Sequence, residues 1–310
     1  MAAAARSCEA PTMPLWIAAT LAACSFQAVR FLLQKRMSGG GLGPVAATFA
    51  RFVYAPVALG LGLLIWRWSA AAPMPTLREG FWPFAVAGAV SQILATVLVV
   101  ATFSRRNFAV GIALSKTTVL MTVATGAVLL GEVPRAAALA AIVVGVVGVL
   151  LVSVPRGVRW RAGLADRAVL YGLGAGALFA VSGVSYRGAS LAVASEAALV
   201  RAAATLFFVT SVQTVVLALW MLWRDRAALR GTFRRWRMSL AIGATSMLGS
   251  LAWFTAYTLE QAALVNAVGQ VELILSLLIS ATLLGERVSG REVAGTGLIG
   301  LSVAVILFAP

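Results

Sequence analysis

The chain has 310 residues, of which 61% are hydrophobic and only 11% are charged, whereas soluble domains carry about a quarter charged residues. This composition indicates an integral membrane protein. No histidine occurs, which removes the commonest general base and the commonest metal ligand. The sequence therefore predicts no catalytic residue, no metal site and no cofactor. The net charge of +15 comes from arginines clustered between apolar runs, a pattern typical of membrane topology and not of nucleic-acid binding.

Ten apolar segments are long enough to cross the hydrocarbon core of a bilayer, which takes about 20 residues of helix. In chain order they are residues 14–34, 44–66, 81–103, 107–130, 134–154, 168–187, 198–223, 239–259, 263–284 and 290–309. The breaks between them are short and rich in Gly, Pro and Arg. Strands of a membrane barrel would be about half as long and would alternate in polarity. The predicted fold is an all-α membrane protein with ten transmembrane helices.

The two halves of the chain repeat each other. "LLGEVP" at 129–134 returns as "LLGERV" at 283–288, an offset of 154 residues. Earlier in each half, Arg51 in the second helix pairs with Arg201 in the seventh. The chain is therefore expected to consist of two five-helix repeats, residues 14–154 and 168–309. Because five is odd, the second repeat is inverted in the membrane relative to the first, which lets two halves rock around a central site.

In each repeat the fourth helix ends in "LLGE" and is followed by a fifth helix of small residues. Ten helices in two repeats of this kind resemble the EamA-type members of the drug/metabolite transporter superfamily. Gly131–Glu132 and Gly285–Glu286 match the helix ends of that family, and Arg51 and Arg201 match its second-helix arginine. The resemblance implies a secondary transporter with a central cavity lined by the first, third and fourth helices of each repeat. It also implies fifth helices that pack at the edge or form dimer contacts.

Lysine and arginine are distributed unequally between the two sides of the predicted bundle. The side that holds both termini carries five of them, and the opposite side carries sixteen. By the positive-inside rule the richer side faces the cytoplasm, so both termini are predicted to lie outside a bacterial inner membrane that the chain crosses many times. The basic stretch "RDRAALRGTFRRWR" at 224–237 is interpreted as a solvated loop beside anionic headgroups.

Two residues of opposite charge lie deep in the predicted helices. Lys116 is central in the fourth helix, and Glu272 lies about nine residues, or about 14 Å, into the ninth. An ionised group at that depth costs at least about 2.5 kcal/mol and usually faces the bundle interior. The 154-residue offset maps Lys116 onto Gln270 and Thr118 onto Glu272. The two charges are interpreted as a structural ion pair, as contacts to a charged or zwitterionic substrate, or, for Glu272, as the carrier of a coupling proton.

Helical geometry, at about 100° per residue, places further polar and aromatic side chains on the faces of these helices. The complete set of predicted substrate or cavity residues is Lys116, Glu272, Gln92, Thr96, Ser115, Thr118, Ser250, Trp253, Tyr257, Asn266, Gln270, Gln27, Arg30 and Tyr186. Arg30, Arg51 and Arg201 lie near helix ends, where long side chains can also snorkel to the membrane surface.

This cavity suits an amino acid or another small polar metabolite better than a lipophilic cation. Small multidrug exporters of the superfamily carry their coupling glutamate in the first helix, where this chain has no acid. The predicted function is a secondary transporter of small polar metabolites across the inner membrane by alternating access, with export the expected direction. The expected partners are a small-molecule substrate, a coupling proton and membrane lipid, without nucleic acid, and the glycine-rich fifth and tenth helices leave a homodimer open.

Two other functions compete with transport. A membrane-embedded enzyme would need clustered acids, a nucleophile or a metal site, and the chain shows no such cluster. A non-transporting receptor or assembly protein usually adds a soluble domain, and the longest loop here is too short to fold alone. Both alternatives are therefore disfavoured.

Overall fold

The computed structural model describes residues 13–39, 44–71, 73–103, 114–153, 167–283 and 289–308. Within these ranges seven helices are long and apolar enough to cross a membrane. Shorter apolar helices at Leu15–Arg30, Thr118–Leu130 and Ala262–Leu275 account for the other predicted segments. The all-helical membrane fold expected from the sequence is confirmed.

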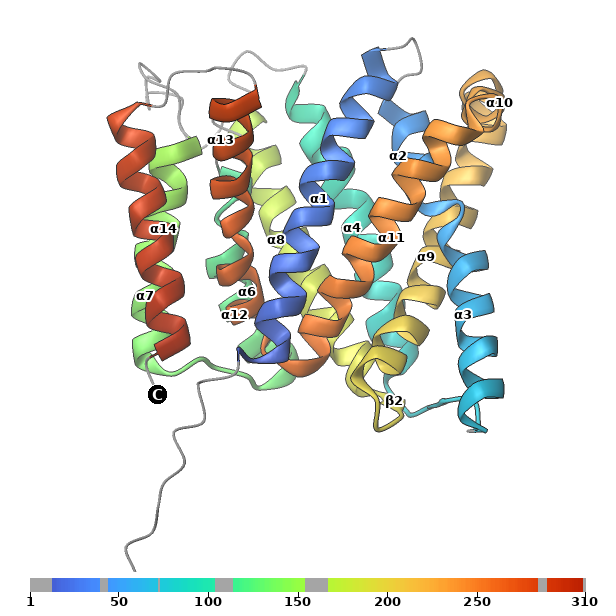
Figure 1. Ribbon diagram of the computed structural model, residues 1–310, viewed down its shortest axis with the longest axis horizontal. Helices are drawn as coiled ribbons and strands as arrows, with labels where there is room; N and C mark the ends of the chain where they lie inside the picture. Colours follow the sequence, from blue (N-terminus) through green and yellow to red (C-terminus); the bar gives the residue numbers. More distant parts are fainter. Residues whose placement is uncertain are drawn as a thin grey trace, which may run out of the picture.

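The helices run up and down in a single bundle (Figure 1). Those of the first half are α1 (Leu15–Gly39), α2 (Pro44–Phe52), α3 (Ala55–Ala70), α4 (Phe81–Phe103), α6 (Thr118–Leu130) and α7 (Ala136–Ser153). Those of the second half are α8 (Arg167–Leu191), α9 (Ala198–Arg224), α10 (Arg226–Arg234), α11 (Trp236–Leu259), α12 (Ala262–Gly269), α13 (Val271–Leu283) and α14 (Gly290–Phe308). A short antiparallel ribbon of β1 (Thr76–Leu77) and β2 (Val193–Ala194) links the two halves.

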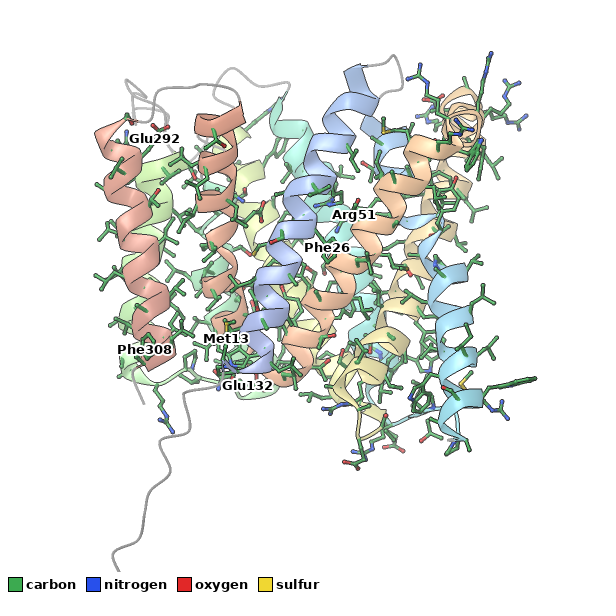
Figure 2. All side chains as sticks on the ribbon, in the orientation of Figure 1. Met13, Phe26, Arg51, Glu132, Glu292 and Phe308 are labelled. Carbon is green, nitrogen blue, oxygen red and sulfur yellow. The ribbon has the colours of Figure 1, made fainter. Side chains whose placement is uncertain are left out.

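The halves run in opposite directions, as an inverted repeat requires. We call the end of the bundle that holds Met13, Glu132 and Phe308 the termini end, and the end that holds Glu292 and α10 the opposite end (Figure 2). α1 starts at the termini end, whereas its repeat counterpart α8 starts at the opposite end (Figure 1). The packing follows the same symmetry, because α1 packs along α11 and α8 packs along α4. The core of the bundle therefore lies where the two repeats meet.

Three spanning segments are interrupted within the described ranges. The break between α2 and α3 precedes Pro56, which has no amide hydrogen and whose ring clashes with the carbonyl group of the fourth residue before it. The fourth spanning segment turns at Lys116 and Thr117, before α6 begins, and the ninth turns at Gln270, between α12 and α13. Since 154 residues separate Lys116 from Gln270, these two breaks occupy related positions in the repeats.

The basic stretch 224–237 is helical over α10, which corrects its interpretation as a solvated loop. Asp225 caps this helix, because its Oδ1 accepts a hydrogen bond of 2.9 Å from the amide of Ala228. Thr232 is fully buried, and Ala228 and Leu229 are half-buried against the bundle. These three positions share one helical face, so the segment is amphipathic although its composition is dominated by arginine.

The fifth helices of the two repeats, α7 and α14, pack against each other within the chain. Their backbones approach closely at two glycines. A Cβ atom built on Gly148 would lie 2.6 Å from the backbone oxygen of Gly295, and one built on Gly295 would lie 2.7 Å from that of Gly148. Small residues allow this approach, as is usual between transmembrane helices.

Replacing Gly148 by Ala is therefore expected to destabilise the protein. The added methyl group meets backbone that cannot move aside as a side chain can, and overpacking of this kind typically costs about 1 to 3 kcal/mol. Thermal unfolding of the purified protein in detergent measures the effect. Gly297→Ala on α14 is the matched control, because a Cβ there has nothing within 4 Å. Equal melting temperatures for the two variants would contradict the close α7–α14 contact.

Candidate functional site

Glu272 lies in the first turn of α13, immediately after the break at Gln270. One of its carboxylate oxygens accepts a hydrogen bond from Nε2 of Gln27 on α1. Its charge also acts on Arg30, which lies one turn further along α1 and is only 5% exposed. The first helix therefore presents an amide and a cation to this carboxylate.

Lys116 occupies the break before α6 and is half-buried. Lys116 and Glu272 both lie near Cys24 on α1, whose Sγ donates a hydrogen bond of 3.4 Å to the carbonyl oxygen of Gly269. No ion pair joins Lys116 to Glu272 in the part of the chain that the structure describes. The two charges thus approach the same stretch of α1 without neutralising each other by direct contact.

Arg51 reaches across the bundle interior instead of snorkelling to the membrane surface (Figure 2). Its Nε donates a hydrogen bond of 3.1 Å to Oγ of Ser246 on α11, and its guanidinium group lies 5.0 Å from the ring centroid of Phe52. The charge of Arg51 also acts on Arg30 and on Tyr186. We call Lys116, Glu272, Gln27 and Arg30 the charged centre. Arg51 and Ser246 extend it, although neither belongs to the predicted set of substrate or cavity residues.

A chain of hydrogen bonds joins three helices next to this centre. The hydroxyl group of Tyr257 on α11 donates a bond of 2.7 Å to Oδ1 of Asn266 on α12, and Nδ2 of Asn266 donates one of 3.0 Å to Oγ1 of Thr122 on α6. Trp253 stacks on Tyr257 with 5.8 Å between ring centroids. Gly269 makes room for that tryptophan, since a Cβ there would lie 2.3 Å from its ring.

Arg187 of α8 ties several segments together at the termini end. Its Nε lies 2.8 Å from both carboxylate oxygens of Glu132, and its Nη1 donates to the carbonyl oxygens of Tyr257 at 2.8 Å and Glu260 at 2.6 Å. We call Arg187, Glu132 and these two carbonyl groups the latch. Glu132 is the acid of the first "LLGE" motif and is labelled in Figure 2, whereas Gly285–Glu286 of the second motif lies outside the described residues.

Gln92 and Tyr186 belong to a neighbouring buried cluster between α4, α8 and α9. The Tyr186 hydroxyl lies 2.9 Å from Oε1 of Gln92 and 3.0 Å from the carbonyl oxygen of Gly88. Nε2 of Gln213, which the sequence did not single out, donates to Oε1 of Gln92 over 2.7 Å. The ring of Tyr186 stacks on Phe254 with 4.4 Å between centroids. This cluster joins helices of both repeats beside the charged centre.

Three further residues predicted to line the cavity donate side-chain hydrogen bonds to backbone carbonyl groups. The bonds, 2.8 to 3.0 Å long, run from Thr96 to Gln92, from Thr118 to Gly176 on α8, and from Gln270 to Asn266. Ser115 is buried beside the break at Lys116, and Ser250 is half-buried on α11.

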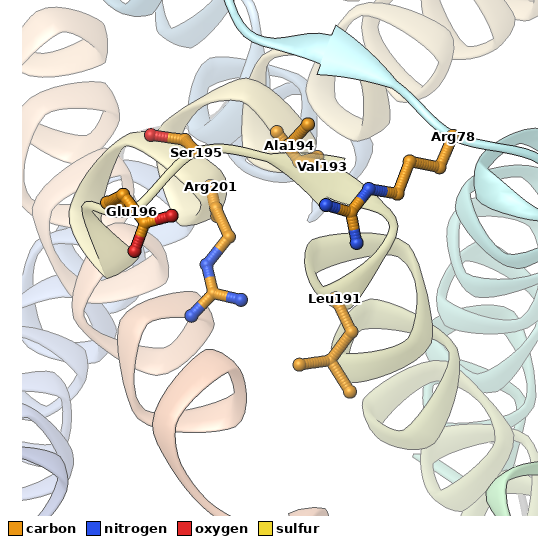
Figure 3. Close-up of a pocket in the computed structure, with 7 residues that line it drawn as sticks. All are labelled: Arg78, Leu191, Val193, Ala194, Ser195, Glu196 and Arg201. Atoms are coloured by element: carbon orange, nitrogen blue, oxygen red, sulfur yellow. The ribbon is translucent and has the colours of Figure 1, made fainter.

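A separate pocket of about 440 Å³ opens at the termini end beside the β1–β2 ribbon (Figure 3). Arg201, the repeat counterpart of Arg51, lines it together with Arg78 and Glu196. The ribbon positions Arg78, whose amide donates a 2.8 Å hydrogen bond to the carbonyl oxygen of Ala192. No residue of the predicted substrate set lines this pocket, so it is distinct from the charged centre.

Known proteins resemble this chain in sequence and in fold. Residues 14–154 and 166–308 each match the model of the EamA-like transporter family. One crystal structure, described only as that of a protein, superimposes with a TM-score of 0.70 at 17% sequence identity, covering 94% of this chain and 95% of its own. At that identity the likeness shows the fold alone. No curated protein matches the chain. Since the two family matches together span nearly the whole sequence, the chain belongs to the EamA-like transporter family and is a secondary transporter, not an enzyme.

Proposed function

We propose that this transporter exports small zwitterionic metabolites such as amino acids across the bacterial inner membrane by alternating access. The observation that carries the proposal is the placement of Lys116 and Glu272 at related helix breaks without a direct ion pair. A zwitterion offers a carboxylate to Lys116 and an ammonium group to Glu272, so one ligand satisfies both charges. Charge-assisted hydrogen bonds of this kind are roughly twice as strong as neutral ones.

The helix breaks themselves favour binding of a carboxylate. α6 begins immediately after Lys116 and Thr117, and α13 begins immediately after Gln270. The first turn of a helix carries amide groups without intrahelical partners and the positive end of the helix dipole. Transporters with discontinuous helices direct such ends at the anionic group of a substrate. The start of α6 therefore adds to the cationic field of Lys116, whereas the start of α13 acts on the carboxylate of Glu272 in its own first turn.

The hydrogen bond from Gln27 gives Glu272 a partner that a substrate can displace. The amide of glutamine is a neutral donor, and an ammonium group is a charged one, so the carboxylate gains more from the substrate than it loses with the glutamine. Arg30 acts on Glu272 through its charge but forms no ion pair with it among the described residues, so Gln27 is the partner that the substrate displaces. The pairing with Gln27 thus keeps the carboxylate ordered and available.

The latch and the Tyr257–Asn266 hydrogen bond support closure of the termini end in this conformation. By the 154-residue offset, the positions related to Tyr257 and Asn266 hold Phe103 and Ile112, whose side chains have no hydrogen-bonding atom. The side chains of these two residues therefore cannot form the counterpart of that bond. We propose that the termini end opens when the latch and this hydrogen bond break, and that substrate leaves there.

A screen of released metabolites tests the function directly. Cells that overproduce the protein are expected to enrich the medium in at least one zwitterionic metabolite, compared with cells that produce Glu272→Gln at the same level. Purified protein in liposomes then confirms the candidate by counterflow of the labelled compound. Release of purely cationic or purely anionic compounds, with no zwitterion among them, would overturn the proposed substrate class.

The same proposal places both termini outside the cytoplasm. Alkaline phosphatase fused after Phe308 is expected to be active in intact cells, and a green fluorescent protein at the same site is expected to be dark. Fusions that end at Arg230 in α10, on the other side of the membrane, serve as the control and should show the reverse pattern. Fluorescence from the C-terminal fusion would contradict this topology.

A further inference from the structure

We propose that α10 is a binding surface for anionic phospholipids and that it transmits lipid binding to α2, the half-helix that carries Arg51. The binding surface consists of the six arginines between residues 224 and 237, which lie on α10 and beside its two ends. Its ligand is the phosphate of an acidic lipid headgroup, and its effect is on the conformation of the charged centre.

Positive charge on this surface is not neutralised by the protein. Six arginines lie between residues 224 and 237 against a single acid, Asp225, and the carboxylate of Asp225 is engaged in capping α10. Each of the six is exposed, namely Arg224, Arg226, Arg230, Arg234, Arg235 and Arg237. No ion pair involves any of them among the described residues. Anionic headgroups supply the missing counter-charge.

The geometry of α10 matches that of a helix lying in the membrane interface. Figure 1 shows α10 nearly end-on, whereas the spanning helices are seen from the side, and in Figure 2 nitrogen-tipped side chains fan outward around it. Trp223 and Trp236 beside the arginines are 76% and 54% exposed. Aromatic rings of this kind settle at headgroup depth. A basic loop that was merely solvated would not need large exposed apolar side chains among its charges.

The other face of α10 packs on α2. The ring of Phe233 meets that of Phe49 on α2 edge to face, with 6.2 Å between centroids. Ala228 packs against a buried cluster that contains Ala46 and Ala50 of α2. Because α2 is only nine residues long and bears Arg51 near its end, a shift of α10 moves Arg51 relative to Ser246. Lipid binding outside the bundle is thereby linked to the charged centre inside it.

Lipid binding is tested on the full-length protein in neutral detergent micelles, without substrate. Phosphatidylglycerol is expected to raise the melting temperature, whereas phosphatidylcholine and inorganic phosphate at equal concentration are not.

The triple variant Arg226→Gln, Arg230→Gln, Arg234→Gln should bind phosphatidylglycerol roughly a hundredfold more weakly, since each basic residue near a membrane contributes about a fivefold factor. Removal of three exposed arginines at the termini end, Arg67, Arg78 and Arg135, is the matched control and should leave the shift intact. Equal losses in the two triple variants, or an equal shift with phosphatidylcholine, would overturn the binding site.

Coupling is tested by the reaction rate of Cys24, which lies buried in the charged centre, with a small thiol reagent in a Cys8→Ser background. Phosphatidylglycerol is expected to change this rate at least threefold in the parent protein, and to leave it unchanged in Phe233→Ala, which keeps every arginine and still binds the lipid. Phe308→Ala, an exposed phenylalanine at the other end, is the control and should behave like the parent. A lipid-dependent rate that survives Phe233→Ala would refute the coupling through α2.

The consequence for flux rests on the proposed transport function. Counterflow is expected to be faster in liposomes that contain phosphatidylglycerol, and Phe233→Ala is expected to abolish that difference. Melting temperature and Cys24 reactivity need no substrate, so an error in the proposed substrate class leaves both of those measurements valid.

Discussion

Replacing Glu272 by Gln should reduce transport at least about thirtyfold while the protein stays folded. Glutamine has the same size and can still pair with Gln27, so the packing around the break at Gln270 is retained. The negative charge that receives the substrate ammonium is lost, however. Removing one partner of a desolvated charge pair costs about 2 to 5 kcal/mol, and about 1.4 kcal/mol corresponds to a tenfold change. Counterflow of the substrate into proteoliposomes measures the loss.

Lys116→Gln should show a loss of similar size, because it removes the cation at the related break. Two exposed residues of the same charges, Glu79 and Arg67, provide the controls, and their glutamine variants should transport at the parental rate. Wild-type counterflow in both Glu272→Gln and Lys116→Gln would exclude these two charges from the transport mechanism.

The same variant separates substrate binding from proton coupling. If Glu272 carries the coupling proton, Glu272→Gln should still exchange internal for external substrate but should no longer accumulate it in response to a pH gradient. If Glu272 holds the substrate ammonium, exchange and accumulation should fall together. Measuring both rates in one set of vesicles therefore assigns the role of the carboxylate.

The spanning segments and the inverted repeat were predictable from the sequence because they depend on local composition. A run of apolar residues must form a helix in lipid, where every backbone group needs an internal partner, and the repeat is visible as paired letters such as "LLGE". The charges of Lys116 and Glu272 stood out for the same reason, since few ionisable residues lie so deep. These features require no knowledge of which helices touch.

The environment of Arg51 was not predicted because it depends on a helix break. Counted from the start of a continuous helix, Arg51 lies within two turns of the membrane surface, and snorkelling was the natural interpretation. The break before Pro56 makes α2 a separate short helix that directs Arg51 toward Ser246 on α11. Pro56 is the signal in the sequence that would have indicated this break.

The latch was missed because its partners are distant in the chain. Arg187 was counted only as one of the basic residues at the termini end, and Glu132 only as part of a motif at a helix end. Their pairing requires α8 to pack beside α6 and the end of α11, which follows from tertiary structure alone. The buried bond between Gln213 and Gln92 was missed for the same reason.

Arg187→Gln is expected to lower the stability of this conformation and to open the termini end. The two side chains of the ion pair are 12% and 21% exposed, so the cost should fall below the roughly 3 to 5 kcal/mol of a fully buried pair, at about 2 kcal/mol. Arg187→Lys should recover little of the lost stability. An ammonium group cannot donate to Glu132 and to two carbonyl groups at once, as the planar guanidinium group does. Thermal unfolding of the purified variants measures these differences.

A double-mutant cycle with Glu132→Gln distinguishes a direct pair from two independent effects. If the latch acts as one unit, the double variant should lose clearly less stability than the sum of the two single losses.

Opening of the termini end is measured by the reaction of Cys24 with a charged thiol reagent added from the side of the termini, in a Cys8→Ser background. Arg187→Gln should accelerate this reaction. Arg135→Gln, which replaces an exposed arginine five residues after the end of α6 at the same end, should leave the rate unchanged. Additive stability losses with unaltered Cys24 reactivity would show that the latch does not hold the termini end closed, because breaking a gate must change both the energy of the closed state and access through it.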